Sequence, residues 1–265
     1  MNLPKKKIIF DFGCNNGQNL NYFLHKADIV VAFEANINLV NKIKLEYKKF
    51  IENNKLIIEN IAVTDNQDIK QINFYISKVN DVLSTLYPED YDKYYKQIVK
   101  CEKASSLIKK YLEYLKFSDI EYIKIDAEGS DQYILKDLLK NNILPKNLSV
   151  ECHDPEVLEL LLKSPYKSFK FMEGEDVPKL KHINFVAHSS GPYGDDIPGG
   201  FFDKKSILPY FLNNGLGWKD IHCSLEEREN LQTIKYQPDI HAQGLRYHLK
   251  KIFPSLLKVL KSKIF

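Results

Sequence analysis

The sequence contains no apolar run close to the roughly 18 residues that a membrane-spanning helix requires. Its basic start, MNLPKKKIIFDF, places only three apolar residues between the last lysine and Asp11, which is too few for the core of a signal peptide. The four cysteines form no CxxC pair, so neither a zinc knuckle nor a secreted disulfide framework is indicated. These absences favour a cytoplasmic protein with reduced thiols.

Arginine is nearly absent, since only Arg228 and Arg246 occur in the chain. The net charge is +3, yet residues 249–265 contain five lysines and no acid, so the rest of the chain carries a net charge of −2. A slightly acidic body argues against a nucleic-acid surface, and any phosphate clamp must depend on lysines, backbone amides or these two arginines. We therefore expect a small-molecule substrate and no nucleic-acid partner.

The lysine-rich C-terminal segment predicts an amphipathic helix, because its apolar residues recur at helical spacing between the lysines. A helix of this type can lie on an anionic membrane surface or dock on a partner. We favour packing on its own domain or at a subunit interface, and the sequence does not specify the oligomeric state.

Short apolar runs alternate with longer amphipathic segments along most of the chain. Strands are predicted at residues 7–12, 29–34, 55–63, 121–127 and 147–152. Helices are predicted near residues 17–26, 36–53, 104–116, 130–141 and 154–163. Uniformly apolar strands separated by helices predict an α/β fold with a mostly parallel sheet and helices on both faces.

Three further segments complete this predicted arrangement. Residues 70–77 form an added strand or hairpin arm, and residues 167–173 and 181–190 form an antiparallel pair at the sheet edge. After residue 188 the sequence becomes rich in Gly, Pro and Asp, and a helix follows near residues 204–214. We therefore predict one main domain at residues 1–188 and a C-terminal extension at residues 189–265.

The stretch IIFDFGCNNGQNLNYF, residues 8–23, places an acid and two glycines where a buried strand ends. Ligands of open parallel sheets bind beyond the carboxyl ends of the strands. Gly13 lets the backbone approach a ligand closely, and the following helix offers unpaired amides. An ordinary strand-to-helix turn also uses Gly and Asn, so this stretch alone leaves both readings open.

Glu34 lies at the end of the second predicted strand, twenty-one residues after Gly13. An acid at this place commonly accepts hydrogen bonds from the two hydroxyls of a ribose. A nicotinamide enzyme would open with G-x-G-x-x-G, whereas this chain has D-x-G-x-x-x-G from Asp11 to Gly17. The pattern favours a cofactor that carries an amino acid group, S-adenosylmethionine, over a pyrophosphate cofactor.

Five segments together resemble the FkbM-type S-adenosylmethionine-dependent methyltransferases in their order and spacing. They are FDFGCNNGQN, VVAFEANINLVNKI, NIAVTD, YIKIDAEGSDQYIL and LSVECH, and they cover about residues 7–153. Ala35 stands where the family usually has proline, and Asp131 keeps the charge of the family's second acid. The resemblance implies a Rossmann-like class I methyltransferase fold and O-methylation of sugars or related hydroxylated metabolites.

The same resemblance implies the cofactor contacts. They are Asp11, Gly13, Asn16 and Gly17 on the methionine side, Glu34 and Asn36 at the ribose, Asn60, Ile61 and Ala62 at the adenine, Asp126 where cofactor and acceptor meet, and Ser84 at the cofactor carboxylate. A turn-capping role for the Ser84 hydroxyl fits equally well.

A hydroxyl acceptor needs a base or a metal ion to become nucleophilic. One reading makes His153 or Asp154 the general base, with Asp126 orienting the acceptor and His188 as a second candidate base. The other reading places Mg²⁺ or Mn²⁺ on a set of oxygen and nitrogen ligands, namely Asp126, Glu128, His153 and Asp154. Glu128 and Asp154 also fit helix-capping roles.

The loop GPYGDDIPGGFF has aromatic and carboxylate residues that suit a sugar. The substrate-binding residues that we predict are Tyr193, Asp195, Asp196, Trp218 and His222. A packed lid without substrate contacts is the alternative. The sequence therefore predicts an O-methyltransferase for a sugar, nucleotide-linked sugar or glycan precursor. A nucleotide-dependent oxidoreductase and a non-catalytic binding protein are the alternatives.

Overall fold

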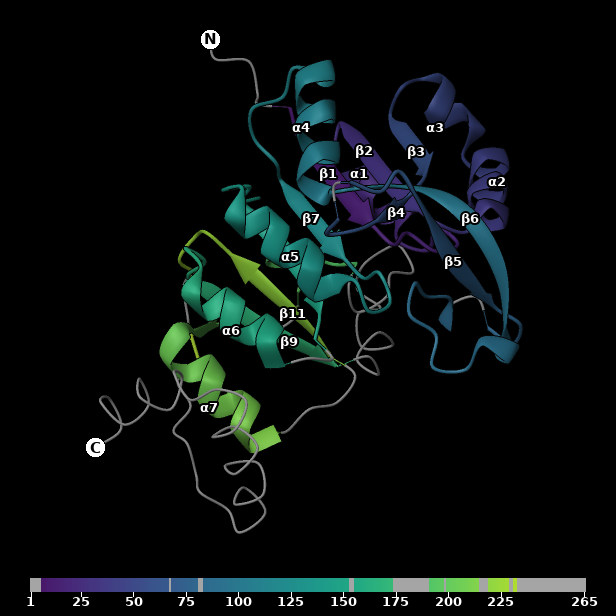
Figure 1. Cartoon of the computed structure of the whole chain (residues 1–265). Coiled ribbons are helices and arrows are strands. Elements are labelled where there is room, and N and C mark those ends of the chain that lie inside the picture. Colours follow the sequence, from purple (N-terminus) through teal and green to yellow (C-terminus); the bar gives the residue numbers. More distant parts are fainter. Residues whose placement is uncertain are drawn as a thin grey trace.

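The computed structural model describes residues 6–66, 68–80, 83–152, 155–173, 191–197, 199–214, 219–228 and 231–232. The described chain forms an α/β structure around one large sheet and one small sheet (Figure 1). The strands of the large sheet are β1 (Ile8–Phe12), β2 (Ile29–Glu34), β3 (Leu56–Asn60), β7 (Tyr122–Ile125), β8 (Asn147–Glu151), β9 (Ser168–Glu173), β10 (Phe202–Asp203) and β11 (Lys219–Ser224).

The large sheet has the strand order β10-β9-β11-β8-β7-β1-β2-β3. Strands β3, β2, β1, β7 and β8 pair in parallel, whereas β11 pairs antiparallel with both β8 and β9. The chain adds strands on one side of β1 first and on the other side later, because β1 pairs with β2 on one side and with β7 on the other. Ligand sites of such sheets lie at this change of side, beyond the carboxyl ends of the strands.

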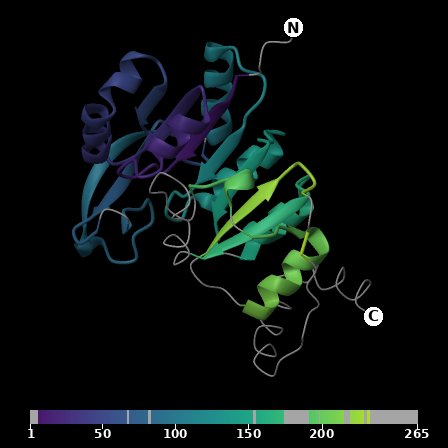
Figure 2. The same ribbon diagram turned by 180° about the vertical axis from the view of Figure 1, so that it is seen from behind.

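Helices cover both faces of the large sheet. Helices α1 (Leu20–Lys26) and α2 (Ile37–Glu46) pack on one face, and α3 (Lys48–Glu52) follows α2. Helices α4 (Ala104–Leu115), α5 (Asp131–Lys140), α6 (Pro155–Lys163) and α7 (Lys204–Asn214) pack on the other face. The view from behind brings α1 in front of the sheet (Figure 2). This arrangement confirms the predicted fold class.

Helix α5 shows why the sequence folds in this way. Its buried residues are Asp131, Ile134, Leu135 and Leu138, which recur at intervals of three and four residues and so share one face. The strands beneath are buried on both sides, and β1 and β8 are buried throughout. Apolar runs without polar alternation are therefore the expected sequence of these strands.

The small sheet has the order β4-β6-β5, with β4 (Ala62–Val63), β5 (Gln71–Ser77) and β6 (Tyr94–Glu102). Strands β5 and β6 form a long antiparallel hairpin that extends from the body beside the ends of β1 and β2 (Figure 1). A short 3-10 turn at Tyr91–Lys93 leads into β6. The inner face of the hairpin packs Phe74, Val99 and Cys101 against Ala62.

Several predictions about the elements need correction. The predicted strand at residues 55–63 is two strands in two sheets, because the chain leaves the large sheet at Ile61. Strands β6 and β11 were not predicted, since lysines and other polar residues interrupt their apolar pattern. Strand β11 also integrates the predicted extension into the large sheet, between β8 and β9.

Two further predictions fall outside the described residues, namely the strand at 181–190 and the basic C-terminal helix. Among the described helices, none has the length and hydrophobicity that crossing a bilayer would require.

Candidate functional site

A cleft of about 710 Å³, including its open mouth, lies at the carboxyl ends of β1, β2 and β7 and is closed on one side by the small sheet. The residues that line it are Gly13, Asn15, Gln18, Phe33, Glu34, Ala35, Ile61, Ala62, Val63, Phe74, Ser84, Leu86, Asp126, Ala127, Glu128 and Ser130.

The turn after β1 forms the floor of the cleft. Gly13 has φ +77°, and a Cβ at this position would lie 1.7 Å from the carbonyl oxygen of Asp126. Only glycine therefore allows the β1 turn and the β7 turn to come this close. Asn15 also has a positive φ of 48°, which asparagine tolerates better than most residues. The two turns thus meet backbone to backbone under the cleft.

Glu34 ends β2 and is buried at the cleft wall, with 7% of its surface exposed. Its Oε2 accepts a hydrogen bond from the backbone N–H of Asn15 at 2.9 Å, and its Oε1 accepts one from the N–H of Asn36 at 2.8 Å. Burial raises the pKa of Glu34 to about 7, although the two N–H donors oppose this rise. Each oxygen keeps a lone pair for a further donor, so the carboxylate is held ready for a ligand.

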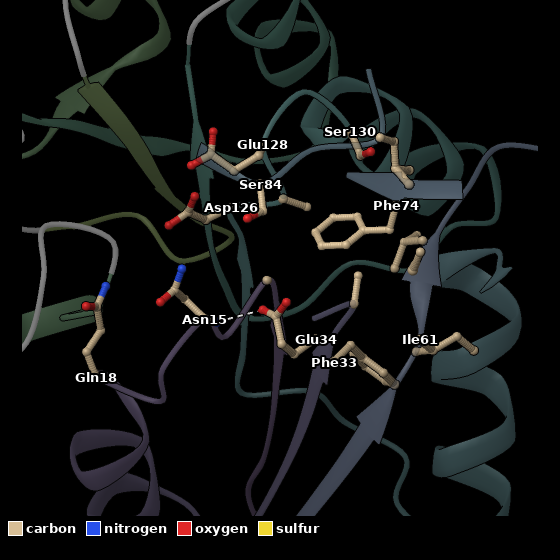
Figure 3. Close-up of a pocket in the computed structure, with 16 residues that line it drawn as sticks. Asn15, Gln18, Phe33, Glu34, Ile61, Phe74, Ser84, Asp126, Glu128 and Ser130 are labelled. Atoms are coloured by element: carbon tan, nitrogen blue, oxygen red, sulfur yellow. Dashed lines mark hydrogen bonds between the residues drawn. The ribbon is translucent and has the colours of Figure 1, made fainter. Parts of the chain in front are cut away.

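The two ends of the cleft differ in chemistry (Figure 3). Asp126 and Glu128 direct their carboxylates to the same side, near Asn15, while Phe74 and Ile61 lie toward the other end. Apolar side chains of β4 and the hairpin complete that second end, including Val63 and Leu86. The cleft can therefore hold a flat apolar group at one end and a charged or polar group at the other.

The turn between β7 and α5 carries the second set of carboxylates. Glu128 adopts a left-handed backbone with φ +44°, and its carbonyl accepts a hydrogen bond from the Thr85 hydroxyl at 2.8 Å. Asp131 accepts backbone hydrogen bonds from Ala127 at 2.7 Å and Gly129 at 3.2 Å. Burial, followed by the nearby Asp126, raises the pKa of Asp131 to about 7. Asp131 therefore holds this turn in place through two of the turn's backbone N–H groups.

Asp126, Glu128 and Glu151 form a carboxylate cluster in which one oxygen from each lies within 4.8 Å of the others. Glu151 ends β8, next to β7, which explains the proximity. Oxygen ligands of this kind suit Mg²⁺ or Mn²⁺, and they also suit general-base chemistry. Glu151 was not among the ligands or bases predicted from the sequence. His153 and Asp154, which were predicted, lie outside the described residues, as do His188 and Trp218.

Six of the predicted cofactor residues line the cleft, namely Gly13, Glu34, Ile61, Ala62, Ser84 and Asp126. The Ser84 hydroxyl also accepts a hydrogen bond from the backbone N–H of Ser77, so it supports its own turn.

The other predicted cofactor residues lie outside the lining, in supporting places. Asn36 caps α2 by accepting a hydrogen bond from the Asn38 N–H, and Asn60 donates its amide to the carbonyls of residues 34 and 35. Gly17 packs under α1 and α2, while the exposed Asn16 accepts a hydrogen bond from the N–H of Gln18. Asp11 is buried beneath the cleft and pairs with Lys124.

The predicted substrate loop lies at the opposite edge of the sheet. The Tyr193 ring stacks on Tyr122 at the start of β7, with ring centroids 4.4 Å apart. Asp195 pairs with Arg228, and Asp196 pairs with Lys26 at the end of α1. Tyr193 thus packs in the interior, whereas Asp195 and Asp196 form ion pairs, that of Asp195 at the surface. All three lie near the amino ends of the strands and away from the cleft, so their position does not support the predicted substrate contacts.

His222 also lies away from the cleft. It is buried within β11, opposite Ser149 of β8 and Lys170 of β9, and it is not among the lining residues.

Besides Glu151 of the carboxylate cluster, sequence reasoning missed Phe74 and Lys124. Phe74 lies on the hairpin, and no local motif marks an aromatic residue that reaches the cleft from a separate sheet. Lys124 is a lysine in the otherwise apolar strand β7, YIKI, and this contrast was a usable signal.

Comparison with known proteins agrees with this geometry. The family profile of the methyltransferase FkbM domain matches residues 11–173. A search of curated proteins gave no significant match.

Three solved structures are among those that align with this chain. A methyltransferase FkbM from Methylobacillus flagellatus KT is 14% identical with a TM-score of 0.41, and the alignment covers 64% of this chain and 40% of that protein. An rRNA methylase from Streptococcus thermophilus is 11% identical with a TM-score of 0.39, covering 87% and 90%. An O-methyltransferase from Bacillus cereus in complex with SAH is 11% identical with a TM-score of 0.39, covering 83% and 74%. On the match of residues 11–173, which is more than half of its length, this chain belongs to the FkbM methyltransferase domain family.

Proposed function

We propose that this chain is an S-adenosylmethionine-dependent O-methyltransferase that acts on a hydroxyl of a sugar, a nucleotide-linked sugar or a glycan precursor. Membership of the FkbM family supports methyl transfer. The observation that carries the choice of cofactor is the buried carboxylate of Glu34, held by two backbone N–H groups at the wall of a cleft that has an apolar end.

The charge of the cleft supports the same cofactor. Its described lining contains three carboxylates, Glu34, Asp126 and Glu128, and no lysine, arginine or histidine. S-Adenosylmethionine carries a sulfonium and an ammonium group against one carboxylate, so its net charge is positive. A nicotinamide dinucleotide carries an anionic diphosphate, which these carboxylates would repel. The lining therefore favours the methyl donor over the cofactor of the oxidoreductase alternative.

Each part of the cleft then has a role. The Glu34 carboxylate accepts hydrogen bonds from the ribose hydroxyls, and the apolar end with Phe74 and Ile61 receives the adenine. Asp126 and Glu128 face the charged part of the cofactor. When bound, S-adenosylmethionine supplies a methyl group on a positively charged sulfur. The chain contributes by holding the acceptor oxygen in line with that methyl group and by excluding water.

The acceptor hydroxyl must also lose its proton. The carboxylate cluster of Asp126, Glu128 and Glu151 is the described group best placed for this task, because it lies at the carboxyl ends of β7 and β8 and two of its members, Asp126 and Glu128, line the cleft. One of its members accepts the proton directly, or the cluster holds Mg²⁺ or Mn²⁺, which lowers the pKa of a bound hydroxyl.

Calorimetry with S-adenosylhomocysteine (SAH) and with NAD⁺ tests the cofactor. We expect SAH to bind and NAD⁺ not to bind; binding of NAD⁺ alone would overturn the proposal. Transfer of a radiolabelled methyl group into a panel of sugars, nucleotide sugars and glycan precursors tests the acceptor. Labelling of an RNA or a protein, with no labelling of any hydroxylated small molecule, would contradict the substrate class.

A further inference from the structure

Lys124 is the one charged residue of β7, and it is buried with only 2% of its surface exposed. Removing an ammonium group from water is costly unless partners replace the water. Its Nζ lies 3.4 Å from Asp11 Oδ1 and 3.2 Å from Asp126 Oδ2, and it donates a hydrogen bond to the carbonyl oxygen of Gly13 at 2.9 Å. Three partners thus surround one buried cation.

These partners come from two neighbouring strands. Asp11 and Lys124 are directly opposite each other in the parallel pair of β1 and β7. Gly13 follows β1, and Asp126 follows β7. Gly13 and Asp126 line the cleft, whereas Lys124 and Asp11 do not. Lys124 therefore acts on the cleft only through its contacts with Gly13 and Asp126.

The charges around Lys124 keep it protonated. Burial opposes its charge, but Asp126 and Asp11 together raise the pKa of Lys124 above its ordinary value. Burial likewise raises the pKa of Asp11, and the neighbouring ammonium opposes that rise. Without the ammonium, Asp126 would lose a partner that fixes one of its oxygens, and the Gly13 carbonyl would lose its donor.

We propose that Lys124 is a positioning residue of the cofactor cleft: its ammonium fixes the Asp126 carboxylate and the Gly13 turn in the arrangement that receives the cofactor. This inference rests on the proposed function. The Asp126 side chain is 27% exposed in the cleft, and its Oδ2 is tied to the buried ammonium of Lys124. Preorganised groups bind more tightly because they lose less entropy on binding. The competing explanation is that Lys124 only neutralises the buried Asp11 and thereby stabilises the fold.

Two variants separate these explanations. Lys124→Met removes the cation and leaves Asp11 buried without it, so it should lower both Tm and SAH affinity. Asp11→Asn combined with Lys124→Met replaces the ion pair with neutral side chains and should recover most of the Tm. If Lys124 positions the cleft, this double variant still binds SAH at least tenfold more weakly than the wild type. Lys100→Met, at an exposed position of β6, is the control and should match the wild type in both Tm and SAH affinity.

The measurements are SAH affinity by calorimetry and Tm by thermal unfolding. A double variant that recovers both Tm and SAH affinity would overturn the proposal, as would Lys124→Met protein that binds SAH like the wild type. Lys124→Gln serves if the methionine variants do not fold, and failure of all three to fold would assign Lys124 to folding and also overturn the proposal. Absence of SAH binding by the wild type would instead refute the proposed cofactor.

Discussion

The ionisation of Glu34 gives a quantitative prediction about cofactor binding. Burial raises its pKa to about 7 in the free protein, and hydrogen bonds from ribose hydroxyls favour the ionised form. If binding requires that form, SAH affinity should be about tenfold weaker at pH 6 than at pH 8, because about one molecule in ten is ionised one pH unit below the pKa. The change should be small between pH 8 and pH 9.

The same ionisation of Glu34 makes the free protein less stable as pH rises, whereas it makes SAH binding stronger. Because the folded-state pKa of Glu34 lies above its usual 4.5, its contribution to stability is complete below about pH 4.5 and is lost as pH rises through about 7. A bound ligand that needs the ionised carboxylate compensates for this loss. Saturating SAH should therefore raise Tm more at pH 8 than at pH 6.

Calorimetry of SAH and of adenosine across pH 6–9 measures the effect, and adenosine controls for titration of the amino acid group. Glu34→Gln should bind both ligands more weakly and with no pH dependence in this range. Asp131→Asn removes the other carboxyl group whose pKa is raised to about 7. It should keep the tenfold change with pH, although losing its hold on the β7–α5 turn should lower SAH affinity at every pH. A Glu34→Gln protein that kept the tenfold change, or a wild type without it, would refute the reasoning.

Three other predictions address the floor, the apolar end and the carboxylate cluster. Gly13→Ala should destabilise the protein far more than Gly129→Ala, because both have positive φ but only the first Cβ would strike backbone, 1.7 Å from a carbonyl oxygen; equal Tm values would contradict the close approach. Phe74→Ala should weaken SAH binding by about 1–3 kcal/mol if its ring stacks on the adenine. Tyr95→Ala, on the same hairpin but 64% exposed, should not, and equal losses in the two would remove Phe74 from the site. If the carboxylate cluster holds a divalent ion, dialysis against EDTA should abolish methyl transfer and Mn²⁺ or Mg²⁺ should restore it. Turnover that EDTA does not change would contradict the metal and would assign the cluster the role of general base.

The sequence predicts the half of the site that local patterns encode. Gly13 and Glu34 follow apolar strands at a fixed spacing, and parallel strands bring their carboxyl ends to one edge of the sheet. Asp126 was assigned from the family resemblance, and the structure brings it beside them because β7 is the other neighbour of β1. Gly13 and Glu34 could be assigned without coordinates because each stands at the end of an apolar strand that the sequence itself indicates.

The remaining features depend on contacts between distant segments. Phe74 reaches the cleft because the β5–β6 hairpin lies beside it. The sequence of β6 is rich in polar residues and does not predict a strand. Tyr193 looked like a sugar contact in a glycine-rich loop, but its ring is buried on Tyr122 at the other edge of the sheet. Composition gives a loop its chemistry, whereas tertiary packing determines which edge of the sheet that loop reaches.

The most direct test of the account is a crystal structure of the protein with SAH. The account predicts that the ligand occupies the cleft, that both ribose hydroxyls donate hydrogen bonds to the Glu34 carboxylate, and that the purine lies against Phe74. A ligand bound elsewhere, or a ribose that does not touch Glu34, would contradict it.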